Sequence, residues 1–99
     1  MEHIYSLGTV VKIKEDPSEY TIIGYCPEDE EKKIHEYIGI NAALGLSLRA
    51  NATCFDEENI EQVVFEGYSD EKGTDFRNRL KSMINKYQSR INKMNTADK

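Results

Sequence analysis

The amino-acid sequence changes its hydrophobic period within residues 63–87, a stretch whose sequence is VVFEGYSDEKGTDFRNRLKSMINKY. Before this stretch apolar residues alternate, as in half-buried strands, and within it they begin to recur at spacings of three and four, as on one helical face. The net charge changes sign at the same place. Residues 1–69 contain fourteen Asp/Glu and five Lys/Arg, a net of −9, whereas residues 70–99 contain four and eight, a net of +4. We therefore predict an acidic β module over 1–69 and a basic amphipathic helix with its tail over 70–99, both parts of one domain.

The acidic module has the composition of a small sheet. Its expected strands are rich in β-branched and aromatic residues, and they lie at residues 7–14, 20–26, 33–40, 53–55 and 62–68. The first two should form a hairpin around a turn at Pro17, where Asp16 and Ser18 can accept hydrogen bonds from nearby amides. The predicted fold class is α+β: a small, curved, mainly antiparallel sheet of four or five strands, for which an SH3-like barrel is one form, with one long C-terminal amphipathic helix.

The helix carries the clearest pattern in the chain. Its apolar residues recur at helical spacing along one face: Phe76, Leu80, Met83, Ile84, Tyr87, Ile91 and Met94. Ser69 or Thr74 is expected to cap its N-terminus. Twenty helical residues span about 30 Å, whereas a strand of six residues spans only about 20 Å. The distal part of the stripe therefore either extends beyond the sheet and needs a partner, or it wraps the sheet or frays. The candidate partner-binding residues are Leu80, Met83, Ile84, Tyr87, Ile91 and Met94.

Size and composition argue against an enzyme. A chain of 99 residues that is 38% hydrophobic can form only a small core, which leaves little room for a concave site. Cys26 or Cys54 could be combined with His35 and Asp56, but no spacing places a nucleophile beside a base. The cysteines and histidines also match no zinc-ligand pattern. We predict no catalytic residue, no cofactor and no metal.

Isolated glycines occur in the expected strands or at their ends: Gly8, Gly24, Gly39 and Gly67. Because none belongs to a glycine-rich loop, they do not indicate a phosphate site. We expect bends and close crossings of the chain at these positions instead.

A cytoplasmic location is expected. No stretch is apolar enough to cross a membrane, residues 1–5 do not begin a secretory signal, and two widely spaced cysteines suit free thiols. The acidic β module is not expected to bind nucleic acid, because phosphate contacts require Lys and Arg. Only the basic helix has the positive net charge that phosphate contacts require.

Several segments share their order with a known family. They are Gly8-Thr9-Val10-Val11, Ile22-Ile23-Gly24, Tyr37-Ile38-Gly39 and the most specific block, Phe55 to Tyr68. The chain thereby resembles, over roughly residues 7–80, the small proteins of the domain of unknown function 4176 (DUF4176) family. The resemblance implies a small cytosolic protein encoded beside LXG toxins in type VII secretion loci of Gram-positive bacteria, and it carries no catalytic residues. Residues 41–51 are more apolar than the corresponding connection of the family.

The expected function is that of a non-enzymatic protein-binding accessory, an adaptor or targeting chaperone of an LXG-type toxin. The partner would be the helical N-terminal region of the toxin or a small helical accessory protein, docked on the apolar helix face. One alternative is an immunity protein whose acidic surface neutralises the cognate toxin. Another is a small-barrel nucleic-acid binder that uses Arg77, Arg79 and Lys81 of the basic helix.

Overall fold

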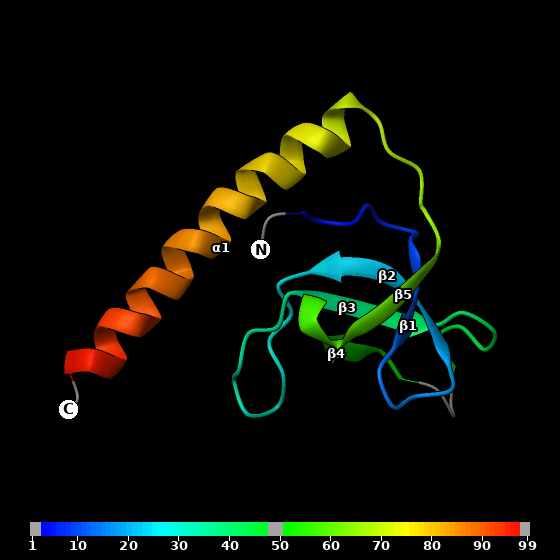
Figure 1. The fold of residues 1–99 in the computed structure, drawn as a ribbon, viewed down its shortest axis with the longest axis horizontal. Coiled ribbons are helices and arrows are strands. Elements are labelled where there is room, and N and C mark those ends of the chain that lie inside the picture. Colours follow the sequence, from blue (N-terminus) through cyan, green and yellow to red (C-terminus); the bar gives the residue numbers. More distant parts are fainter. Residues whose placement is uncertain (1–2, 48–50, 98–99) are drawn as a thin grey trace. The chain divides into compact units, whose positions relative to one another are not determined.

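The computed structural model describes residues 3–47 and 51–97, with side chains in the helix as far as residue 86. Five strands form one sheet in which all neighbours are antiparallel (Figure 1). Their bounds are β1 Val10–Ile13, β2 Glu19–Tyr25, β3 Tyr37–Asn41, β4 Thr53–Phe55 and β5 Ile60–Phe65. The strand order is β4-β3-β2-β1-β5, so β4 and β5 are the edges and the sheet is open, not closed into a barrel. With the C-terminal helix, this confirms the α+β class.

The contacts within the chain divide it into two units, Tyr5–Tyr68 and Ser69–Lys99 with Met1–Ile4. The first unit contains every strand pairing and the single-turn 3-10 helix η1, Glu57–Asn59. The second contains the helix α1, Glu71–Ala97. The described part of the chain contains no helix that is long and apolar enough to span a membrane.

The core of the sheet unit contains both aliphatic and aromatic side chains. Val11, Ile22 and Tyr37 have no exposed surface, and Phe55 is 3% exposed. The Tyr37 ring lies 5.7 Å from that of Phe55 in a stacked arrangement and 6.1 Å from those of Tyr5 and Tyr25. Burial raises the pKa of the Tyr37 hydroxyl, which accepts a hydrogen bond from the backbone N–H of Tyr5. A tyrosine suits this position because its ring fills the core while its hydroxyl has a partner.

Gly67 marks a close crossing of the chain. A Cβ at this position would lie 2.3 Å from the carbonyl oxygen of Leu7 and 2.6 Å from the amide nitrogen of Thr9, so no side chain fits. The Gly67 amide donates to the Thr9 hydroxyl, and the Ser6 hydroxyl donates to the Gly67 carbonyl, both at 3.0 Å. The expected role of Gly67 at a chain crossing is confirmed.

Three strands are shorter at one end than the sequence suggests, and one of them is β5, which ends at Phe65 and not at residue 68. β1 begins at Val10, not residue 7, because Gly8 has a positive φ of 89° and turns the chain. Leu7, which strand alternation over residues 7–14 would place on the same face as Val11, is consequently 49% exposed. β3 begins at Tyr37, not residue 33, because the residues before it belong to a polar loop held by side-chain hydrogen bonds.

The helical unit begins with a capped turn. The carboxylate of Asp70 accepts a hydrogen bond of 2.8 Å from the Gly73 amide, and the Asp70 carbonyl accepts one from the Thr74 amide. Asp70 is therefore the N-cap, and the sequence-based choice of Ser69 or Thr74 is wrong. An aspartate also complements the positive end of the helix dipole, which a serine or threonine does not. Among the described side chains of this unit, the buried apolar ones are Ile4, Leu80 and Ile84.

Candidate functional site

The apolar face of α1 contains both buried and exposed side chains. Leu80 and Ile84 are 9% and 7% exposed, whereas Met83 is 64% exposed and Phe76 is 54% exposed. Among the predicted partner-binding residues, Met83 is thus accessible and Leu80 and Ile84 are covered. The side chains of Tyr87, Ile91 and Met94 lie outside the described residues. Phe76 was part of the predicted apolar stripe but not of the predicted partner-binding site. Like Met83, it is an exposed residue of α1.

The basic flank of α1 is partly engaged within its own unit. One terminal nitrogen of the Arg77 guanidinium donates to the Ser69 hydroxyl and, at 3.3 Å, to the Thr74 hydroxyl. These contacts fold the side chain back over the first turn of the helix. The predicted nucleic-acid surface of Arg77, Arg79 and Lys81 therefore contains one guanidinium that already has local acceptors.

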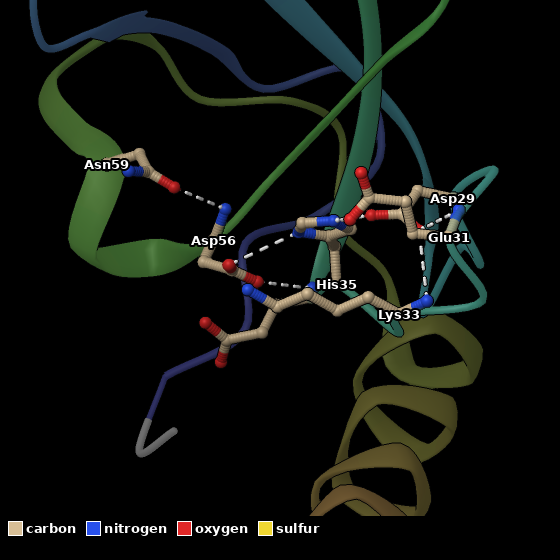
Figure 2. A network of polar contacts seen from close by, with 7 residues as sticks. Asp29, Glu31, Lys33, His35, Asp56 and Asn59 are labelled. Atoms are coloured by element: carbon tan, nitrogen blue, oxygen red, sulfur yellow. Dashed lines mark hydrogen bonds and ion pairs between the residues drawn. The ribbon is translucent and has the colours of Figure 1, made fainter.

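A polar network in the sheet unit centres on His35 (Figure 2). The His35 Nε2 atom lies 2.8 Å from a carboxylate oxygen of Asp29, and the Nδ1 atom lies 3.3 Å from one of Asp56. The side chains of all three residues are less than one third exposed. The imidazole thus bridges two carboxylates that come from different segments, the loop between β2 and β3 and the turn before η1.

Local hydrogen bonds orient both carboxylates. The Oδ1 atom of Asp29 accepts from the backbone amides of Glu31 and Lys33, each at 2.9 Å, which closes a tight turn. Asp56 accepts from the Glu36 amide at 2.9 Å and donates its own amide to the Asn59 side chain. Both carboxylates are therefore held by backbone amides as well as by His35, and we call this network, which joins the loop to the turn before η1, the His35 clamp.

The charges of the network reinforce each other. The hydrogen bond to Asp29 is the main cause that raises the pKa of His35, and the same bond is the main cause that lowers the pKa of Asp29. A protonated imidazole can donate from both nitrogens at once, which two carboxylates require. The arrangement therefore favours an imidazolium between two carboxylates.

A Cys/His/acid catalytic site requires a histidine nitrogen that can accept a proton from the thiol. The structure does bring His35 and Asp56 together, although no spacing in the sequence predicts this contact. However, both ring nitrogens of His35 face carboxylates. Burial raises the pKa of the Cys54 thiol, and the charges of Asp29 and Asp56 raise it further. Burial also raises the pKa of Cys26. Both cysteines are free, and this environment favours the thiol, which is the poorer nucleophile.

The same geometry bears on metal binding. Asp29 and Asp56 lie at opposite nitrogens of the His35 ring, so their oxygens do not converge on one point with a ring nitrogen (Figure 2). Within residues 3–47 and 51–97, no group of three or more His, Cys, Asp or Glu side chains could hold a metal ion.

The comparison with known families rests on the sheet unit. The family model "Domain of unknown function (DUF4176)" matches residues 4–76, which is more than half of the chain. The chain belongs to this family. No curated protein and no solved structure matches the chain.

The DUF4176 match covers all five strands and only the first turns of α1. It includes the His35 clamp and the Gly67 crossing, and it ends at Phe76, slightly before the limit that the resemblance suggests. The six predicted partner-binding residues, from Leu80 to Met94, all lie past its end. The matched segment therefore contains the whole sheet and the start of α1, and the predicted partner-binding residues lie in the part of the chain that the family model does not cover.

Proposed function

We propose that this chain is a non-enzymatic protein-binding accessory, an adaptor or targeting chaperone, of an LXG-type toxin of a type VII secretion system, and that it acts in the cytoplasm. The observation that carries the proposal is the 64% exposure of Met83 on the apolar face of a basic helix. A methionine that is largely exposed on such a face suits an adaptable protein interface. DUF4176 membership supports the setting, through the toxin neighbourhood that the resemblance to this family implies.

The proposed mechanism is helix-to-helix docking. Phe76 and Met83 lie seven residues apart, two turns along one face, which is the spacing of anchors that enter a groove between partner helices. Tyr87, Ile91 and Met94 would extend this row of anchors. The partner would be the helical N-terminal region of the toxin or a small helical accessory protein, and acidic residues beside its groove would complement the Lys and Arg residues of α1.

The first test is a matched pair of substitutions measured by titration calorimetry against the N-terminal region of an LXG-type toxin. Met83→Glu should weaken binding at least about tenfold, because it places a charge in the proposed apolar contact. Leu44→Glu is the control, since Leu44 is 62% exposed but belongs to the sheet unit. Equal affinities of both variants and the unmodified chain would reject the helix as the interface.

The distal anchors need their own test. Tyr87→Ser and Ile91→Ser should leave the circular dichroism of the sheet unchanged and abolish capture of the same toxin region. Because these changes remove apolar area without adding charge, they separate loss of packing from electrostatic repulsion. Full binding by the double variant would confine the interface to the first half of α1.

An immunity protein is the second candidate. The observation in its favour is the charge of residues 5–68, with thirteen Asp/Glu and five Lys/Arg, a net of −8. A surface of this sign suits occlusion of a toxin that binds nucleic acid through Lys and Arg. In cells that express the toxin's catalytic domain alone, coexpression of this chain would restore growth if it is an immunity protein. The adaptor proposal expects no restored growth, because an adaptor would bind the N-terminal region of the toxin, which is absent from the catalytic domain.

A further inference from the structure

The strand β5 forms an edge of the sheet. Among the described residues it pairs with β1 on one side, and no strand pairs with its other side. Its apolar residues Val64 and Phe65 are 43% and 62% exposed, and Tyr68 beyond its end is 81% exposed. The opposite edge, β4, contains only three residues, whereas β5 contains six. β5 is therefore the longer of the two edges, although its pairing with β1 shifts register at two points.

The charges on this edge are of one sign. Residues 51–69 contain five acidic residues and no Lys or Arg. Glu61 and Glu66 lie on either side of the segment Val63-Val64-Phe65 and are exposed. An incoming strand would thus meet an apolar centre with a carboxylate at each end.

This charge pattern opposes pairing with a second copy of the chain. If two β5 strands paired antiparallel about Val63 and Val64, Glu61 of each copy would lie opposite Glu66 of the other. Like charges directly opposite each other destabilise a strand pair, and opposite charges stabilise it. The edge therefore disfavours its own sequence and favours a strand with basic ends.

We propose that the outer edge of β5 is a docking site for an extended segment of a partner protein that has Lys or Arg at both ends of a short apolar centre. The segment adds to the sheet as a sixth strand. Backbone hydrogen bonds along the edge provide affinity, and Glu61 and Glu66 select the basic ends. This site goes beyond the proposed function and is independent of it, because it uses no residue of α1.

The test uses the full chain labelled with nitrogen-15 and two synthetic peptides, KTVTVK and ETVTVE. The lysine peptide should shift the amide resonances of residues 60–66 in a saturable manner. Its affinity should exceed that of the glutamate peptide at least about tenfold at low salt, and the difference should shrink at high salt. No shift of these resonances at about 2 mM lysine peptide, or equal affinity for both peptides, would overturn the proposal.

A charge exchange makes the test specific. The double variant Glu61→Lys/Glu66→Lys should reverse the preference and bind the glutamate peptide more tightly. The control Glu30→Lys/Glu58→Lys changes the net charge by the same amount at two exposed positions outside β5, and it should keep the original preference. A reversal in both variants would mean that net charge alone attracts the peptide, and this would also overturn the proposal.

The same titration separates this site from the helix surface. Met83→Glu should bind the lysine peptide as tightly as the unmodified chain does, whatever its affinity for the toxin. Peptide-induced shifts confined to α1 would contradict docking at β5 and leave the helix proposal standing.

Discussion

His35 bridges carboxylates from two different segments, so its charge state decides how firmly the loop before β3 is held to η1. The pKa of His35 is raised above its ordinary value of 6.5, chiefly by the hydrogen bond to Asp29. A raised folded-state pKa contributes stability that is complete below the unfolded value and is lost as the pH rises through the folded value. The clamp should therefore stabilise the fold in mildly acidic solution and weaken under basic conditions.

We expect His35→Gln to lower the urea midpoint more at about pH 5.5 than at about pH 8.5, because only the protonated imidazole donates to both carboxylates. Chemical unfolding at the two pH values measures the effect. His3→Gln is the control for removal of one histidine. A loss of stability that is the same at both pH values would mean that His35 contributes packing and not charge.

At acidic pH, the stability of the fold depends on the protonation of carboxylates. The pKa of Asp29 is lowered mainly by its hydrogen bond with His35, and that of Asp16 is lowered mainly by the Ser18 amide. Lowered folded-state pKa values give stability that is present above the ordinary value of 3.8 and is lost as the pH falls through the folded values. Stability should therefore be highest between about pH 4 and pH 6.5, and differential scanning fluorimetry across pH 2 to 9 measures this window. A continuous rise in stability from pH 6.5 to pH 9 would contradict this.

Gly67 provides a second prediction at the scale of one residue. Gly67→Ala should destabilise the chain by about 3 kcal/mol, because the new methyl group would overlap rigid backbone of Leu7 and Thr9. Gly73→Ala is the matched control, since it lies in α1 and its nearest neighbours are side-chain atoms of Arg77 and Asp70, not backbone. That control should be neutral or stabilising by up to about 1 kcal/mol. Thermal unfolding of both variants measures the difference in stability. Equal losses of stability would contradict the close approach of Gly67 to the backbone of Leu7 and Thr9.

At the scale of elements, the start of α1 gives a direct comparison. Asp70→Ala should destabilise the helix by about 1 kcal/mol, because it removes the acceptor for the Gly73 amide. Thr74→Ala should have little effect, because Thr74 lies inside the helix. Far-ultraviolet circular dichroism with thermal unfolding measures both variants. A larger loss of helicity for Thr74→Ala than for Asp70→Ala would mean that Thr74 is the N-cap.

The elements differ in how much of them the sequence could predict. The segment 20–26 was expected to form a strand, and β2 occupies Glu19–Tyr25, because its β-branched and aromatic residues decide its conformation locally. The start of β3 could not be predicted, because it depends on hydrogen bonds that backbone amides donate to Asp29 and to Asp56, and Asp56 is distant in the sequence. An aspartate that accepts from amides two and four positions later is one signal that was available for Asp29.

The candidate sites show the same division. Helical spacing placed Leu80, Met83 and Ile84 on one face, but the period cannot show which members are covered and which are exposed. Only the structure separates the buried Leu80 and Ile84 from the exposed Met83. Likewise, His35 and Asp56 come together through the pairing of β3 with β4, whose register is a tertiary property.

For the whole molecule, the division into two units predicts the outcome of truncation. A chain that ends at Tyr68 should retain its near-ultraviolet dichroism, because every strand pairing and the buried Tyr37 lie within residues 5–68. Cooperative urea unfolding of the truncated chain measures this. Loss of the tyrosine signal would mean that the sheet requires the helical unit.

The position of β1 has a consequence for synthesis of the chain. Val10 pairs on one side with Thr21, which is near in sequence, and on the other with Phe65, which is far away. On the ribosome, the hairpin of β1 and β2 can form early, whereas the second edge of β1 stays unpaired until β5 has been translated. Such non-local pairing is slow, and an unpaired edge can capture foreign strands. The nascent chain is therefore most prone to aggregation during translation of the residues that separate β2 from β5, and this interval ends when β5 pairs with β1.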